Sequence, residues 1–264
     1  MGAWPCDSMM LARGGLSAEV ESCVEEGGFP VGSLINRFFL METTAAAASA
    51  GGFFPSFLLL AFGTLVAAVL GAAHRLGLFY QLMHKVEETL PDNALLVVDG
   101  GDFVATAAYL VQPRGPLRWL DPGAFGTLGV GAGFALGAKL CQPEAEVWCL
   151  FGDGAFGYSL IEFDTFVRHK VPVIALVGND AGWTQISREQ VPRLGSDVAC
   201  SLAYTDYHKA AMGLGAQGLI LSRDNEDQVV KVLRDGQKLC QEGHAVVVNI
   251  LIGRTDFRDG SISV

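Results

Sequence analysis

The chain has 264 residues, of which half are hydrophobic, only 17% are charged and 33 are glycine. This composition excludes a disordered or fibrous protein and favours an α/β protein with a buried sheet. The formal net charge is −10. It argues against nucleic acid as a partner, because nucleic-acid-binding proteins usually carry a basic surface.

The six cysteines form no C-x-x-C pair, and no histidine lies at zinc-finger spacing from them. Two of them, Cys141 and Cys149, lie in apolar surroundings and are predicted to be small core residues. This use of cysteine fits a reducing, cytosolic environment for the folded part of the chain.

The N-terminal part contains a candidate membrane segment. Residues 1–52 show no sustained hydrophobic period and are predicted to be a disordered extension. Phe53–Ala73 is an uninterrupted run without a charge. It is long enough to cross a bilayer and longer than the apolar part of a signal peptide; a buried core helix is the alternative. We predict a transmembrane anchor at residues 53–75, followed by a linker at 76–88, with the C-terminal side in the cytosol.

From residue 89 to 264, strand-like and helix-like segments alternate. The predicted strands are 94–99, 146–151, 172–178, 218–221 and 245–252, and the predicted helices are 128–141, 158–169, 204–212 and 226–242. The strands are continuous apolar runs, as in parallel strands that are covered on both faces. This order predicts a doubly wound α/β fold, a parallel sheet with helices on both faces. Such sheets bind ligands at the carboxyl ends of their strands.

Two polar turns follow neighbouring predicted strands. Gly152-Asp153-Gly154 ends one strand, and Asn179 ends the next, with one predicted helix between them. One right-handed crossover covers this separation and brings both side chains to the same edge of the sheet. Mg²⁺ prefers oxygen ligands and often takes few from protein and the rest from diphosphate and water. The helix start after the first turn also favours an anion. These turns can therefore offer backbone amides to a phosphate and a carboxylate and an amide oxygen to a cation such as Mg²⁺.

This spacing resembles the signature of thiamine-diphosphate-dependent enzymes. In that family the aspartate, the asparagine and a main-chain carbonyl two residues after the asparagine hold the metal. By this resemblance, the metal ligands here are Asp153, Asn179 and the carbonyl of Ala181. The family usually has paired asparagines, and Gly178 stands in the place of the first. The resemblance implies thiamine diphosphate and Mg²⁺ as cofactors.

A second stretch, Asp121–Lys139, is similar to a glycine-rich segment of acetolactate-synthase-like enzymes. There, a carbonyl binds the cofactor's amino group and a bulky apolar side chain props its two rings, roles that fall on Gly126 and Leu128. The alternative, a dinucleotide-binding fingerprint, fails because the third glycine is missing. The cofactor-binding residues implied by the resemblance are Gly126, Thr127, Leu128, Gly152, Asp153, Gly154, Ala155, Asn179, Gly182 and Trp183.

A third stretch, Val97–Ala108, occupies the end of the first predicted strand. In the family this turn helps to grip the diphosphate, often with a Gln-His pair, whereas Asp102 and Phe103 stand there in this chain. Contacts from these two side chains are therefore not expected, whereas backbone contacts from Gly100 and Gly101 stay open.

Four further residues have interpretations of their own. Trp183 either lines the pocket or belongs to the core. Glu189 is expected on the solvated face of a helix. His169 and His208 are expected on helix surfaces, without a catalytic role.

The likeness extends over about Met41 to Val264 and is strongest to membrane-anchored members of the acetolactate-synthase-like group. It implies a lyase that cleaves 2-hydroxyacyl-CoA into an aldehyde and formyl-CoA, held in the endoplasmic reticulum membrane by one helix. In the family the catalytic glutamate lies on a preceding pyrimidine-binding domain, whereas only residues 76–88 separate the anchor from the cofactor domain here. We therefore expect an internally shortened form that has no catalytic residue of its own and is inactive alone.

Two alternatives stay open. One is a non-catalytic, membrane-tethered module that associates with full-length relatives or with copies of itself. The other is an acetolactate-synthase-like carboligase acting on 2-oxoacids.

Overall fold

The computed structural model describes residues 81–254, all of them within one unit, Ala67–Val264. The predicted extension at 1–52 and the predicted anchor at 53–75 lie outside the described residues and stay predictions. Within residues 81–254, no helix has the length and apolar character needed to cross a membrane.

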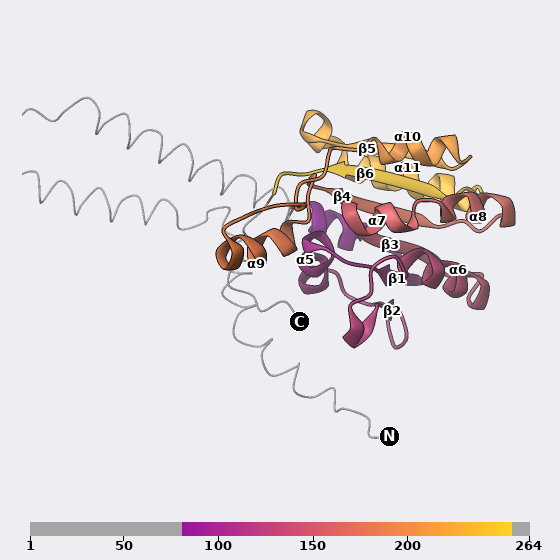
Figure 1. Ribbon diagram of the computed structural model, residues 1–264. Helices are drawn as coiled ribbons and strands as arrows, with labels where there is room; N and C mark the ends of the chain where they lie inside the picture. Colours follow the sequence, from indigo (N-terminus) through magenta and orange to yellow (C-terminus); the bar gives the residue numbers. More distant parts are fainter. Residues whose placement is uncertain (1–80, 255–264) are drawn as a thin grey trace, which may run out of the picture. The chain divides into compact units, whose positions relative to one another are not determined.

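Six parallel strands form one sheet in the order β2-β1-β3-β4-β6-β5 (Figure 1). The strands are β1 (Ala94–Val98), β2 (Trp119–Leu120), β3 (Glu146–Gly152), β4 (Ile174–Asn179), β5 (Gln217–Leu221) and β6 (Val246–Leu251). In the sheet, β2 lies on one side of β1 and β3 on the other. The chain therefore winds in one direction from β1 to β2 and in the opposite direction from β2 to β3. A crevice is therefore expected beyond the carboxyl ends of β1 and β3, where the winding direction reverses.

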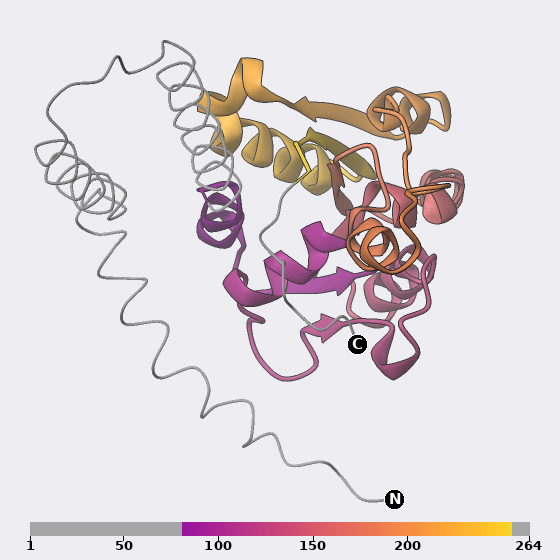
Figure 2. The same cartoon turned by 60° about the vertical axis from the view of Figure 1, so that its left-hand side comes forward.

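Helices cover both faces of the sheet, as predicted (Figures 1 and 2). One face carries helical residues 81–89, α5 and α11, and the other carries α6, α7, α8 and α10. The helices are α5 (Asp102–Leu110), α6 (Gly131–Cys141), α7 (Asp153–Ser159), α8 (Glu162–His169), α9 (Thr184–Leu194), α10 (Tyr207–Gly213) and α11 (Val229–Gln241). Short 3₁₀ turns occupy Gly123–Phe125 and Arg223–Gln228.

The two apolar layers explain why the strands read as continuous apolar runs. Leu95 and Val97 of β1 belong to the core cluster on the α6 side, and Leu96 and Val98 belong to the cluster on the α5 side. Successive side chains of a strand point to opposite faces, so a strand covered on both faces needs an apolar residue at every position.

Helical residues 81–89 are part of the folded domain. Leu82, Met83 and Val86 are buried in the core cluster that also contains α5 and α11. Arg114 forms an ion pair with the Glu87 side chain and donates a hydrogen bond to its carbonyl at 2.8 Å. The described part of the predicted linker 76–88 is therefore packed against the sheet.

Three expectations about local structure were wrong. The predicted helix 158–169 is two helices, because α7 already begins at Asp153 and the chain turns at Leu160 before α8. Cys141 is exposed at the end of α6, whereas Cys149 is buried as predicted. His208 is buried and its Nδ1 lies 3.3 Å from the side chain of Asn249, because the side of α10 that carries it packs on β6. His169 is exposed, as expected.

Candidate functional site

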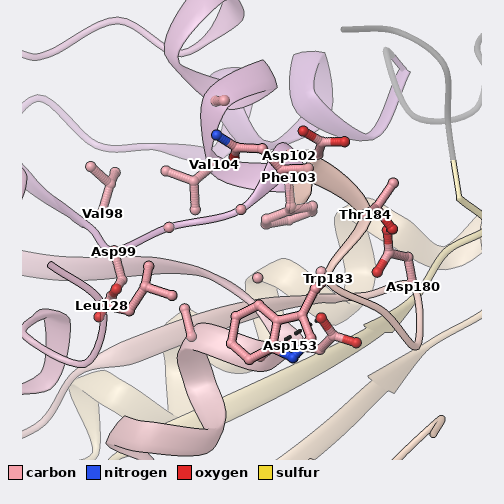
Figure 3. A pocket seen from close by; sticks show the side chains of 18 of the residues that line it. Val98, Asp99, Asp102, Phe103, Val104, Leu128, Asp153, Asp180, Trp183 and Thr184 are labelled. Carbon is pink, nitrogen blue, oxygen red and sulfur yellow. Dashed lines mark hydrogen bonds between the residues drawn. The ribbon is translucent and has the colours of Figure 1, made fainter. Parts of the chain in front are cut away.

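A cavity of about 570 Å³ opens at the carboxyl ends of β1, β3 and β4. Its walls come from the turns after these strands, from the segment after β2 and from the first turn of α9. Asp99 and Leu128 lie at one end of the view in Figure 3, and Asp180 and Thr184 at the other, with Asp153 and Trp183 between them. The cavity thus lies at the strand ends where the sheet order predicts a ligand site.

Close packing explains the two glycines that flank Asp153. The N–H of Gly152 donates to the carbonyl of Gly100 at 2.8 Å, and a Cβ on Gly152 would lie 2.7 Å from that oxygen. A Cβ on Gly154 would lie 2.5 Å from the indole ring of Trp183. Both distances are shorter than real contacts, so a side chain at either position would displace a wall of the cavity. Trp183 therefore lines the cavity and lies directly over Gly154.

Asp153 is a buried acid of this site, beside the turn at residues 178–183. It lies at the start of α7, directly after β3, and its side chain is almost inaccessible to solvent. Its Oδ1 accepts a hydrogen bond from the N–H of Gly154 at 2.8 Å, and its Oδ2 accepts one from the N–H of Gly182 at 3.1 Å. Burial, together with the nearby carboxylate of Asp180, raises the pKa of Asp153 to about 6. A bound cation would relieve this cost of holding a buried negative charge.

The turn that carries the predicted ligands Asn179 and Ala181, here called the metal turn, spans residues 178–183 and begins with the last two residues of β4. Gly152 of β3 pairs with Gly178 of β4. Asp153 and Asn179 come directly after these two glycines, so they lie next to each other at the same edge of the sheet. The amide oxygen of Asn179 accepts a hydrogen bond from the N–H of Ala181 at 3.3 Å. The carbonyl of Ala181 accepts from the N–H of Leu202 at 2.9 Å and from Arg254 at 3.0 Å.

The predicted metal ligands differ in how they meet the cavity. Asp153 lines it, whereas Asn179 and Ala181 are buried and are not among its lining residues. Within residues 81–254, no three His, Cys, Asp or Glu side chains gather as a metal site. The candidate set is instead one carboxylate, one amide oxygen and one main-chain carbonyl, which are ligands suited to a hard cation such as Mg²⁺.

The charge of the cavity also favours a cation. Five aspartates line it, and none of its described lining residues is a lysine or an arginine. Of the five, only Asp102 forms a salt bridge within the described part of the chain, with Arg188 of α9. A diphosphate entering so acidic a cavity needs a cation between it and the carboxylates. The donor set and the charge therefore both fit a Mg²⁺-bridged diphosphate. The five aspartates are Asp99, Asp102, Asp121, Asp153 and Asp180.

Asp99 fixes the glycine-rich segment and was not predicted as a site residue. Its buried carboxylate accepts hydrogen bonds from the N–H groups of Gly129, at 3.0 Å, and Gly131, at 2.8 Å. Burial raises the pKa of Asp99, while these hydrogen bonds oppose the rise. These hydrogen bonds hold Leu128 over Gly100. A Cβ added to Gly100 would lie 2.2 Å from Cδ2 of Leu128. An acid that ends a buried apolar run was the signal available in the sequence.

The other predicted site residues fall into two groups. Gly126, Leu128, Gly152, Gly154 and Ala155 line the cavity, and Thr127 does not. Gly100 and Gly101, which were considered for backbone contacts, also line it, as do Asp102 and Phe103. Glu189 is partly exposed on α9 and pairs with Arg193 at 2.9 Å, which confirms the expected solvated position.

Comparison with known proteins decides the family. Residues 99–250, more than half of the chain, match the family "Thiamine pyrophosphate enzyme, C-terminal TPP binding domain". The chain belongs to this family. The matched residues run from Asp99 at the end of β1 to Ile250 in β6, and thus include Asp153 and the whole metal turn.

Named relatives extend this result. The chain is 96% identical over 183 residues to "2-hydroxyacyl-CoA lyase 2" of Mus musculus, which covers 69% of this chain and 29% of the mouse protein. It is 86% identical over 184 residues to the Homo sapiens protein of the same name, which covers 70% of this chain and 29% of the human protein. It is 38% identical over 164 residues to "Probable acetolactate synthase" of Mycobacterium bovis, which covers 61% of this chain and 29% of the mycobacterial protein. The match thus spans about three tenths of the length of these curated relatives.

The packing around Gly178 gives a first prediction. Gly178 stands where thiamine pyrophosphate enzymes usually have an asparagine, and a Cβ there would lie 2.1 Å from Cγ of Phe103. Replacing Gly178 by alanine should therefore destabilise the fold by about 1–3 kcal/mol, the usual cost of overpacking. Thermal unfolding checks this. The double variant with Phe103→Ala should recover part of the loss, and a variant as stable as the wild type would show that the ring can move aside.

The raised pKa of Asp153 gives a second prediction. Because a carboxylate must be ionised to bind a metal, Mg²⁺ affinity should fall once the pH drops below about 6. With a pKa of about 6, only about a tenth of the carboxylate is ionised at pH 5, so affinity should be roughly tenfold lower there than at pH 7.5. Calorimetry with Mg²⁺ and no cofactor should also show proton release near pH 6. Equal affinity at the two pH values would contradict the assignment.

Proposed function

We propose that this chain binds thiamine diphosphate through Mg²⁺ in the cavity, and that it serves the cleavage of 2-hydroxyacyl-CoA into an aldehyde and formyl-CoA. The observation that carries the binding proposal is the buried carboxylate of Asp153 at the end of β3, hydrogen-bonded to the metal turn after β4. The substrate proposal is supported by the printed names of the mouse and human relatives.

The chain's own residues would hold the cofactor as follows. Asp153, Asn179 and the carbonyl of Ala181 would bind Mg²⁺, and Leu128 and Trp183 would enclose the cofactor between apolar walls that exclude water. When bound, thiamine diphosphate supplies the nucleophilic carbon and the electron sink for breaking a carbon–carbon bond.

The glutamate that activates the cofactor in this family must come from elsewhere. None of the described residues that line the cavity is a glutamate. We infer that a separate domain or a second chain supplies this side chain, and that the domain described here shows little turnover without it. The same reasoning supports association with full-length relatives, which would carry this glutamate.

Two measurements test this function. Calorimetry of thiamine diphosphate binding to the chain should show heat with Mg²⁺ and none with a chelator. Exchange of the cofactor's C2 proton, followed by NMR, should be slow with the chain alone and rise when a full-length relative is added. Binding that needs no metal would overturn the metal assignment, and fast exchange with the chain alone would overturn the need for a second domain.

A second candidate function is carboligation of 2-oxoacids, which the similarity to the mycobacterial protein favours. Product analysis separates the two. The chain mixed with a full-length relative should release formyl-CoA from a 2-hydroxyacyl-CoA and should form no acetolactate from pyruvate. The reverse result would favour the carboligase.

We also propose that residues 53–75 anchor the chain in the endoplasmic reticulum membrane, with the cofactor domain in the cytosol. The support is the uninterrupted charge-free run Phe53–Ala73, which is long enough to cross a bilayer. Extraction of membranes with alkaline carbonate should leave the chain in the pellet, and protease added to intact microsomes should digest the cofactor domain. Release into the supernatant would contradict the anchor.

A further inference from the structure

Asn249 is a polar residue in the middle of an apolar strand. It lies in β6, whose other residues are aliphatic, and it is fully buried. A buried amide is costly unless its hydrogen bonds are satisfied, by a few kcal/mol in proteins. Its bonds should therefore show why β6 carries an amide at this position.

The amide of Asn249 connects directly to that of Asn179. Its Oδ1 accepts a hydrogen bond from Nδ2 of Asn179 at 3.3 Å. Its Nδ2 donates to the carbonyl of Thr205 at 3.1 Å and lies 3.3 Å from Nδ1 of His208. The same Thr205 carbonyl accepts a second bond from Nδ2 of Asn179, at 3.0 Å.

These contacts fix which way the Asn179 amide points. Both hydrogens of its Nδ2 have acceptors, on Thr205 and Asn249, so its oxygen faces the opposite way, where it accepts from Ala181 of the metal turn. A flip of the amide, exchanging its oxygen and nitrogen, would set the Asn179 oxygen against two other oxygens and leave its NH₂ group facing an N–H donor. The contacts with Thr205 and Asn249 together therefore disfavour the flipped state.

We propose that Asn249 is a positioning residue that holds the Asn179 side chain with its oxygen toward the metal turn, ready to bind Mg²⁺. This inference rests on the proposed function, since it assumes that Asn179 is a metal ligand. Groups that orient a ligand commonly matter to metal affinity by about 10–100-fold. The position of Asn249, 70 residues from Asn179 in the chain, explains why the metal signature does not include it.

Three variants test the inference. Asn249→Leu removes both hydrogen-bonding groups at similar size. In Asn249→Asp, burial favours the neutral carboxylic acid, whose carbonyl can accept from Asn179 and whose O–H can donate to Thr205. Val248→Ala is the matched control, because Val248 is the fully buried neighbour on β6 and its aliphatic side chain forms no hydrogen bonds.

The readout is Mg²⁺ affinity, measured by calorimetry at fixed thiamine diphosphate, beside thermal unfolding. Asn249→Leu should weaken Mg²⁺ binding about 10–100-fold, while Asn249→Asp stays within about threefold of the wild type. Val248→Ala should unfold at a lower temperature and bind Mg²⁺ as the wild type does. Equal Mg²⁺ affinity in the wild type and Asn249→Leu would overturn this inference alone. A wild type that binds no thiamine diphosphate with Mg²⁺ would overturn the proposed function and this inference with it.

A second measurement covers the case in which Asn249→Leu does not fold. In the wild type, the side-chain amide hydrogens of Asn179 should exchange slowly with solvent by NMR, because both are hydrogen-bonded and buried. Free exchange of these hydrogens would overturn the inference without any variant.

Discussion

Replacing Asp153 by asparagine is expected to weaken Mg²⁺-dependent binding of thiamine diphosphate by at least about 100-fold. Loss of an outer-shell partner already costs about 10–100-fold in metal affinity, and this change removes the charge of a direct ligand. The fold should survive, because an asparagine oxygen can still accept one of the two N–H groups that Asp153 binds. Calorimetry in excess Mg²⁺ gives the affinity, and thermal unfolding reports on the fold.

The matched control for this variant is Asp121→Asn. Asp121 also lines the cavity, but its carboxylate accepts hydrogen bonds from the Trp119 indole at 2.9 Å and the N–H of Gly123 at 2.7 Å. It is not a candidate ligand, so binding should stay close to that of the wild type. If both variants lose the same affinity, the cavity responds to charge in general and Asp153 is not a metal ligand. If neither loses affinity, the diphosphate is held in another way.

Much of the sheet was predictable because its signals are local. All five long strands were found near their observed bounds, since each is an apolar run between polar turns. β2 was missed because it has two residues, Trp119 and Leu120, too few for any pattern. The break between α7 and α8 was missed because Leu160 and Ile161 continue the apolar pattern through the turn.

Helix α9 shows a second limit of sequence patterns. None of its residues is fully buried, so it lacks the apolar stripe that predicts a helix packed on a core. An ion pair from Arg188 to Asp102, 86 residues away in the chain, joins it to α5. A contact between such distant residues leaves no spacing to detect.

The site divides in the same way. Asp153 and its flanking glycines were predicted, because the turn, the strand before it and the spacing to Asn179 are all visible along the chain. The residues that hold these groups in place were not, because they act from other strands and helices. Asp99 clamps the glycine-rich segment, and Asn249 orients Asn179. Each is a polar residue within or at the end of an apolar strand, which is the only trace of its role in the sequence.

Replacing Phe156 by alanine should cost about 3–5 kcal/mol of unfolding free energy, the usual range for a buried aromatic side chain. Phe156 is fully buried in α7, and its ring lies edge-on to three others at centroid distances of 5.2 Å for Phe151, 5.6 Å for Phe163 and 5.2 Å for Tyr207. Domains of this kind are stable by only about 5–15 kcal/mol, so this one change should remove a large share. Urea unfolding followed by circular dichroism measures it.

The same change should reach the metal site through Tyr207. The Tyr207 hydroxyl donates to the main-chain carbonyl of Asp153 at 3.1 Å, and its ring packs on Phe156. Removing the Phe156 ring leaves a cavity beside the Tyr207 ring, so Tyr207 can shift and the start of α7 loosens. Mg²⁺ affinity should therefore fall in molecules that are still folded. Phe125→Ala is the control, because Phe125 is 94% exposed and such surface changes stay within about 0.5 kcal/mol. A loss of stability with unchanged Mg²⁺ affinity would show that Asp153 is held without Tyr207.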